Sequence, residues 1–76
     1  MKPIAVESTT LAALAYDADR QLLQLTFRHG AVYQYTGVPA DVFTDLLLAP
    51  SKGGYFNRVI RGHFPYARVS TQRSLS

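Results

Sequence analysis

The sequence predicts an α+β domain in which a small antiparallel sheet, of three strands or four, carries two helices packed on one face. Two observations predict this class. Short runs in the first half alternate apolar and polar residues with the period of a strand, and turn residues separate them. From Pro39 onward, apolar residues recur at the spacing of a helix. The 76 residues suffice for one domain, and strands followed by helices are typical of this class.

Three runs are predicted to form the sheet. In residues 21–28, leucine and phenylalanine alternate with polar side chains, which makes this the clearest strand. Residues 11–17 place Leu14 and Tyr16 on one face, as a strand does, although the alanines around them also suit a short helix. Residues 31–35 are rich in side chains that favour strands and follow a glycine-containing turn, so they are predicted to complete a hairpin.

Two helices are predicted after the strands. Pro39 suits the first turn of the first helix, because proline has no backbone donor to lose there. Pro50 ends that helix. Ser51 is a good N-cap for a second helix, which is expected to run to about Gly62, a residue type common just past a helix C-terminus.

Charge is unevenly distributed along the chain. All five acidic residues precede residue 46, whereas the last 25 residues carry +5, against −2 for the first 51. Such asymmetry indicates an anionic partner for the C-terminal part, or else a solvated basic surface. The sequence has no cysteine, no leader pattern and no apolar run long enough to span a membrane. We therefore expect a cytoplasmic protein with no membrane partner.

Neither histidine has a partner that would make it catalytic. His29 is predicted in a turn and His63 after a helix, and no nucleophile or carboxylate stands at a recognisable spacing from either. The acidic residues are scattered, so no metal site is predicted. We expect no cofactor and no enzymatic activity.

The run Ser51-Lys52-Gly53-Gly54 stands just before the second predicted helix. Glycines let backbone N–H groups approach a phosphate, and helix N-termini attract anions. The spacing is not that of a P-loop, and glycines equally allow two helices to pack closely. The packing interpretation is favoured, with phosphate binding as the alternative.

Tyr33 and Tyr35 must share one face of their strand, because successive side chains alternate. The preceding loop decides which face. A two-residue loop pairs Phe27 with Val32 and places both rings on the polar face beside Arg28. There they would form an aromatic platform for stacking nucleic-acid bases.

A three-residue loop gives the opposite result. With a bulge at Gly30, Phe27 pairs with Ala31, and both tyrosines join the apolar face. The choice matters because a slip of one residue moves every side chain to the other face. We favour this second register, since a core this small needs its large aromatic side chains.

Several short segments follow one another in a distinctive order and spacing: Tyr16-Asp17, Leu25-Thr26-Phe27, Gly30, Val32-Tyr33-Gln34-Tyr35, Gly37-Val38-Pro39, Ala49, Ser51-Lys52-Gly53, Tyr55-Phe56-Asn57 and Ile60-Arg61. In this pattern, the stretch from Ser8 to Phe64 resembles the KTSC domain. That family takes its name from the C-terminus of some lysyl-tRNA synthetases and also occurs alone in short bacterial and phage proteins. Pro50 departs from the pattern, where the family more often has a small residue. We expect one domain over residues 1–64, followed by an extended basic tail over residues 65–76.

Function is predicted from the basic residues together with the resemblance, whose synthetase context suggests RNA binding. The leading hypothesis is an RNA- or nucleic-acid-binding module that acts through charge, with weak sequence preference. Its predicted contacts are Lys52, Asn57, Arg58, Arg61, Arg68 and Arg28, with Tyr33 and Tyr35 as stacking residues. The alternative is a protein-interaction or assembly module, either a homodimer or an accessory subunit docking on a larger enzyme, since Tyr and Arg are common interface anchors.

Overall fold

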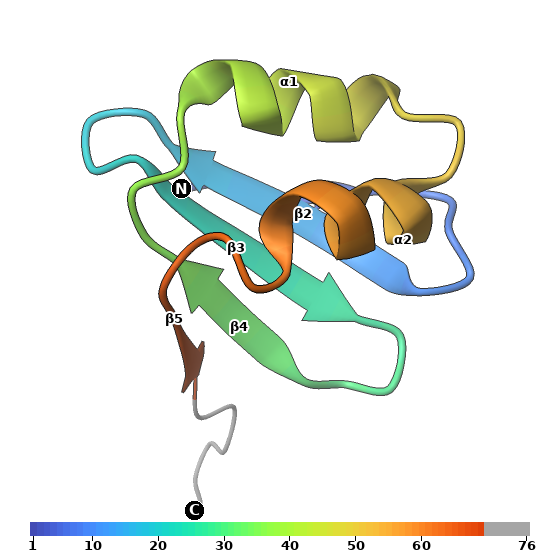
Figure 1. Ribbon diagram of the computed structural model, residues 1–76. Helices are drawn as coiled ribbons and strands as arrows, with labels where there is room; N and C mark the ends of the chain where they lie inside the picture. The colour runs from blue at the N-terminus through green and yellow to red at the C-terminus, as the bar shows by residue number, and fades with distance from the viewer. Residues whose placement is uncertain (70–76) are drawn as a thin grey trace, which may run out of the picture.

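The computed structural model describes residues 1–69, which form a five-stranded antiparallel sheet with helices covering one face (Figure 1). The strands neighbour one another in chain order, from β1 to β5. Their bounds are Ile4–Ala5 for β1, Leu11–Asp17 for β2, Leu22–Phe27 for β3, Val32–Tyr35 for β4 and Tyr66–Val69 for β5. Between β4 and β5 lie α1 (Ala40–Leu48), α2 (Lys52–Tyr55) and the π-helical segment η1 (Phe56–Ile60).

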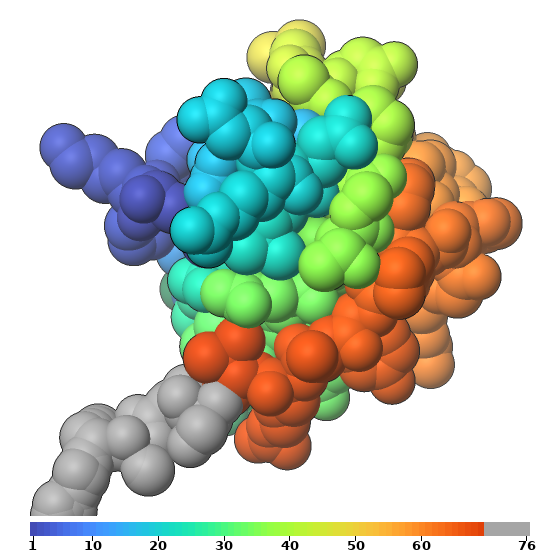
Figure 2. Space-filling view, turned by 90° about the vertical axis from the view of Figure 1, so that its left-hand side faces the viewer, coloured from blue at the N-terminus to red at the C-terminus, as the bar shows by residue number. Residues whose placement is uncertain are grey.

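The α+β class is confirmed, but the predicted number of strands is wrong, because two edge strands were missed. Strand β1 has two residues, which is too short to show an alternating pattern. Strand β5 falls in the segment predicted as an extended tail and pairs antiparallel with β4. In Figure 2, β5 (red-orange) lies directly against the green residues of β4. Residues 70–76 of the predicted tail lie outside the described residues.

The β3–β4 hairpin has the three-residue loop. The Phe27 amide donates to the Ala31 carbonyl at 2.9 Å, and the Gly30 amide donates to the Phe27 carbonyl at the same distance. Gly30 has φ +102°, a backbone conformation that favours glycine. Tyr33 therefore pairs with Leu25, and Tyr35 with Leu23, on the apolar face. The alternative register, with both tyrosines beside Arg28 on the polar face, is wrong.

A β-bulge shapes the second strand. The register shifts between Leu11 and Ala13, so Leu11 and Leu14 both reach the core although they are three residues apart. The largest fully buried side chains come from sheet and helices alike: Leu11, Leu14, Leu23, Leu25, Val38, Leu46 and Ile60. On the opposite face, Gln34 donates to Gln24 at 2.9 Å, as expected for polar side chains on strands that face away from the helices.

The second helical segment begins as predicted and then changes its winding. The Ser51 hydroxyl accepts from the Gly54 amide at 3.2 Å and so caps α2. From Phe56 onward the segment is π-helical, and the Arg61 amide donates to the Phe56 carbonyl at 2.8 Å. Gly62, at φ +80°, then turns the chain towards β5. Among residues 1–69, no helix has the length and apolar character needed to cross a bilayer.

Candidate functional site

Three tyrosines from the last two strands form a cluster on the helix-covered face. Tyr66 pairs with Tyr35 across β4 and β5. Its ring stacks on Tyr33, with centroids 5.4 Å apart and planes 17° apart, and it lies 5.4 Å from the ring of Tyr35. Tyr35 is 3% exposed, whereas Tyr66, on the edge strand, is 61% exposed. The cluster therefore runs from the core to the surface.

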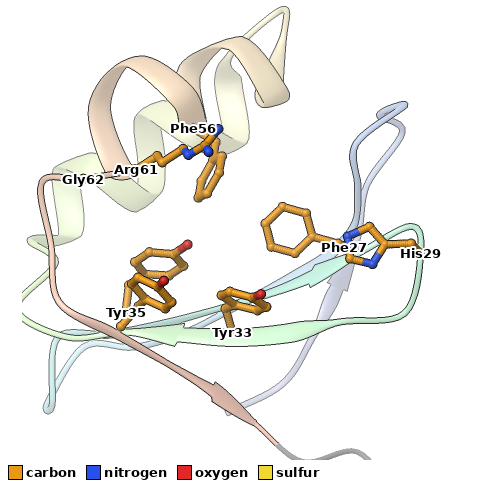
Figure 3. Close-up of a pocket in the computed structure, with 8 residues that line it drawn as sticks. Phe27, His29, Tyr33, Tyr35, Phe56, Arg61 and Gly62 are labelled. Carbon is orange, nitrogen blue, oxygen red and sulfur yellow. The ribbon is translucent and has the colours of Figure 1, made fainter.

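These tyrosines form the floor of a pocket of about 350 Å³ between the sheet and the second helical segment. Figure 3 shows Tyr33 and Tyr35 rising from the sheet, while Phe56 points towards them from the helical side and the Arg61 side chain lies beside Phe56. The pocket is lined by Phe27, His29, Tyr33, Tyr35, Phe56, Arg61, Gly62 and Tyr66. Five of these eight residues are aromatic carbocycles, and none of them is acidic.

The far end of the pocket is formed by a second aromatic group. The His29 ring stacks on Phe27 with centroids 5.7 Å apart and planes 18° apart. Phe27 in turn meets Tyr33 and Phe56 edge-on, at centroid distances of 5.7 and 5.4 Å. Edge-to-face and offset packing of this kind holds aromatic rings in fixed orientations. The wall of the pocket is therefore preformed.

The Tyr35 hydroxyl lacks the partner that a buried phenol usually has. The Tyr16 hydroxyl, also on the apolar face, donates to the Val38 carbonyl at 2.6 Å. The side-chain hydrogen bonds of residues 1–69 include none from Tyr35, although that residue is almost fully buried and lines the pocket. Burial raises the pKa of the Tyr35 phenol, the nearby Tyr66 and Tyr33 phenols raise it further, and Arg61 opposes the rise. Its hydroxyl is thus an unused donor at physiological pH.

The structure distributes the predicted basic helix face over three separate hollows. Arg61 lines the aromatic pocket. Arg58 lines a hollow that also contains Asp45. Lys52 and Asn57 line a third, next to the loop that precedes β2. The cations expected to act together from one helix face therefore have different surroundings.

Two of the predicted contacts have structural roles. The Arg28 guanidinium donates to the carbonyls of Ser8 at 2.9 Å and Val6 at 3.1 Å, so it braces the segment between β1 and β2. The Lys52 ammonium donates to the Ala49 carbonyl at 3.1 Å, which caps the C-terminal end of α1. The donors of both side chains are therefore already partly used.

Arg68 lies close to the aromatic cluster. It pairs with Tyr33 across β4 and β5, and it shares a strand face with Tyr66, two residues earlier. Its side chain is exposed. Arg61 and Arg68 thus approach the tyrosines from the helical side and from the edge strand.

The glycine run at the start of α2 is a packing feature. A Cβ on Gly53 would lie 2.6 Å from the Thr10 hydroxyl oxygen and 3.1 Å from the Thr10 Cβ. Glycine is therefore needed for the helix to approach the loop before β2. The Gly54 amide is already engaged by the Ser51 hydroxyl. These contacts support the packing interpretation over phosphate binding.

Five of the eight pocket residues were not among the predicted contacts. Phe27 and Phe56 were expected only as apolar residues of their strand and helix. His29 was placed in a turn, Gly62 at the end of the second helix and Tyr66 in the tail. One signal could have found Tyr66: Tyr66 and Arg68 alternate with Ala67 and Val69 directly after a proline, as a short edge strand would. Within residues 1–69, no group of His, Asp or Glu side chains is placed to hold a metal ion.

Comparison with known proteins now identifies the fold. The model of the KTSC domain family matches residues 7–64. The chain belongs to the KTSC domain family. The crystal structure of a KTSC domain protein from Yersinia pestis superposes with a TM-score of 0.89 at 33% identity, covering 91% of this chain and 97% of that one. All pocket residues except Tyr66 lie within the matched KTSC segment.

KTSC relatives occur in two settings. A protein of Stutzerimonas stutzeri is 41% identical over 70 residues, which cover 91% of this chain and 99% of that protein. A lysine–tRNA ligase of Nostoc sp. is also 41% identical over 64 residues, covering 84% of this chain. The match accounts for 11% of the ligase. The same KTSC fold therefore occurs as a small protein and as a short part of a much longer one.

Proposed function

We propose that this chain is an RNA-binding module that acts mainly through its arginines. The observation that carries the proposal is the 41% identity to a segment of a lysine–tRNA ligase, whose name specifies an RNA substrate. A small domain added to such an enzyme can contribute by holding RNA through its phosphates without taking part in the reaction. The lack of a paired histidine or a clustered carboxylate in the sequence favours binding over catalysis.

The exposed arginines support the same proposal. Arg58, Arg61 and Arg68 are all exposed. None of them takes part in the ion pair found within residues 1–69, which joins Arg20 to Asp17 at 3.7 Å. Exposed guanidinium groups bind phosphate oxygens well, because their planar fork matches the geometry of phosphate. Arg28 and Lys52 add to the positive field but are expected to contribute less, since each already donates to backbone carbonyls.

A titration with short single-stranded RNA tests the proposal. We expect binding at low salt that weakens as salt increases, with a slope of log K against log salt of about −2 if three phosphates are neutralised. The variant Arg58→Ala/Arg61→Ala should lose about two thirds of this slope. Fluorescence anisotropy of a labelled strand provides the measurement.

The control variant removes two positive charges elsewhere. Lys2→Ala/Arg20→Ala has the same net charge as the test variant, and both replaced side chains are exposed and distant in sequence from the second helical segment. Its affinity and salt slope should stay close to those of the parent chain. No binding at low salt, or equal losses in both double variants, would exclude this mode of RNA binding. Self-association or capture of a protein partner without RNA binding would favour the alternative.

A further inference from the structure

The lining of the aromatic pocket narrows the chemistry of its ligand. Five aromatic side chains present ring faces and edges, which suit a flat ring system. Arg61 adds a positive charge at the helical side, and no acidic residue belongs to the described lining. A quaternary ammonium group also favours aromatic walls, but Arg61 would repel it. A planar ring linked to a negative charge fits best, and a nucleotide has both parts.

The size of the pocket limits how much of a nucleic acid enters it. Its volume of about 350 Å³ is near the lower end of the range for small-molecule sites, roughly 300–1,000 Å³. That volume suits one base with its sugar and excludes a stack of bases. The base must therefore leave its neighbours in the strand, which costs little when the strand is single.

The Tyr35 hydroxyl provides a polar group for such a base. Tyr35 as a residue is 3% exposed and lines the pocket, and the side-chain hydrogen bonds within residues 1–69 include none from its hydroxyl. A buried donor without a partner is costly, so it needs water or a ligand acceptor. Carbonyl oxygens and ring nitrogens on the edge of a base are acceptors of this kind. The sequence suggested Tyr35 as a stacking residue, but its ring is too deeply buried for that role. Its hydroxyl can instead donate a hydrogen bond to the base.

We infer that the pocket binds one unstacked base of a single-stranded RNA, with the attached phosphate against Arg61. This inference rests on the proposed function and assigns it a specific site. The base lies among the rings of the tyrosine cluster, with Tyr66 at the open side, while the strand continues along the edge strand past Arg68. Arg58, in its separate hollow beside Asp45, makes no contact with that base.

Adenosine 5′-monophosphate and uridine 5′-monophosphate are suitable probes, compared with adenosine and inorganic phosphate. We expect a dissociation constant on the order of 1 mM for the nucleotides and weaker binding for each separate part. Backbone amide NMR should show the largest shifts at the residues that line the pocket. Shifts centred on the Lys52–Gly54 region, or equal binding of inorganic phosphate, would overturn the inference.

Substitutions at Tyr66 test stacking, because this exposed residue can change with little effect on folding. Tyr66→Leu should weaken nucleotide binding about 5- to 160-fold, the range for loss of one stacked base, whereas Tyr66→Phe should retain it. Melting curves verify that both variants fold. If Tyr66→Leu binds as well as the parent chain, the base does not occupy this pocket.

Two arginines on the same helical segment provide a matched pair. Arg61→Ala should weaken binding of adenosine 5′-monophosphate while leaving adenosine unchanged, because only the phosphate contact is lost. Arg58→Ala removes the same charge and should have little effect on either probe. Equal effects of the two substitutions would show a general charge effect and overturn the assignment.

The pocket and the broader RNA proposal can fail separately. If single-stranded RNA binds with the expected salt dependence but Tyr66→Leu leaves its affinity unchanged, the pocket inference fails and the proposed function stands. If neither RNA nor nucleotide binds at low salt, both fail. If the nucleotide binds and RNA does not, the RNA role fails together with the assignment of an RNA base to this site.

Discussion

The two ends of the second helical segment differ in how their polar groups are used. At its start, the Gly54 amide bonds to the Ser51 hydroxyl, and the Lys52 ammonium bonds to the Ala49 carbonyl. At its end, Arg61 lines an aromatic pocket together with Tyr35, whose hydroxyl bonds to no described residue. The start has few unused donors to offer a ligand, whereas the end retains both a donor and a charge.

This difference shows why residue types alone are a weak guide to a site. A lysine and two glycines before a helix match the composition of a phosphate site, but their geometry serves packing and capping. The aromatic pocket has no such local pattern, because its residues come from β3, the loop after it, β4, η1, the turn that follows η1, and β5. A ligand site requires polar groups that the fold itself has left unused.

The largest expected effect is on stability at the start of the segment. Gly53→Ala places a Cβ within 2.6 Å of the Thr10 hydroxyl and 3.1 Å of its Cβ, so the helix and the loop must move apart. We expect a loss of about 1–3 kcal/mol in the free energy of unfolding, as for other overpacked sites. Urea denaturation provides the measurement, and the affinity for nucleotide should remain unchanged.

Gly54→Ala is the matched control for this substitution. Its added Cβ would approach mainly the side-chain atoms of Ser51 and Arg58, at 3.0 and 3.5 Å. The better helix propensity of alanine, about 1 kcal/mol, should offset much of that crowding. Thr10→Gly removes the obstacle at Gly53, so a double-mutant cycle should recover most of the loss. Equal costs at both glycines, or no recovery in the cycle, would contradict the packing role.

The fold was largely predictable because its signals are local. Alternation identified the central strands, prolines bounded α1, and Ser51 marked the start of α2. The need for apolar bulk selected the hairpin register at Gly30, which the structure confirms. The edge strands are harder to predict, because β1 has two residues and β5 shows only a four-residue alternation, and both depend on pairing with a neighbouring strand.

The candidate site was predictable only in part. Arg61 and Arg68 were selected for their charge, and Tyr33 and Tyr35 for their spacing. Their convergence depends on β5, which lies directly after the helices and brings Tyr66 against β4. The π-helical winding of η1 also could not be predicted from the spacing of apolar residues, although it sets where Arg61 leaves the helix.

A smaller effect distinguishes the hydroxyl of the partly buried Tyr16 from that of the buried Tyr35. Tyr16→Phe removes the bond to the Val38 carbonyl but keeps the ring stacked on Phe43, at a centroid distance of 4.8 Å. We expect a loss of about 1–2 kcal/mol, because a buried carbonyl is left without its donor. Tyr35→Phe should leave stability unchanged or raise it slightly, because it removes no hydrogen bond to a described residue and takes away a donor without a partner.

The two variants should rank in the opposite order when nucleotide affinity is measured in place of stability. Tyr35→Phe removes the donor proposed for the base and should weaken binding, whereas Tyr16→Phe, outside the pocket, should leave it unchanged. Both variants are compared by urea denaturation and by titration with adenosine 5′-monophosphate. A stability loss for Tyr35→Phe as large as that for Tyr16→Phe would show that its hydroxyl already has a structural role.

The smallest expected effect appears at alkaline pH. The pKa of Tyr35 is raised in the folded chain, first by burial and then by the Tyr66 and Tyr33 phenols, while Arg61 opposes the rise. The unfolded chain therefore loses this proton first, at a pKa near the ordinary value of 10.0. The contribution of the Tyr35 phenol to the free energy of unfolding is therefore constant below that pH and decreases as the pH rises above it.

Tyr35→Phe removes the ionisable phenol, so it tests how much of the loss of stability at alkaline pH comes from Tyr35. Free energies of unfolding measured by urea denaturation between neutral pH and about pH 11 should fall less steeply in this variant than in the parent chain. Part of the decline should persist, because burial also raises the pKa values of Tyr16 and Tyr55. Parallel decline in both proteins would mean that the Tyr35 phenol ionises as readily in the folded chain as in the unfolded one. The hydroxyl would then be as exposed to solvent as in the unfolded chain, and it would not be the buried donor that distinguishes the pocket from the capped start of the helix.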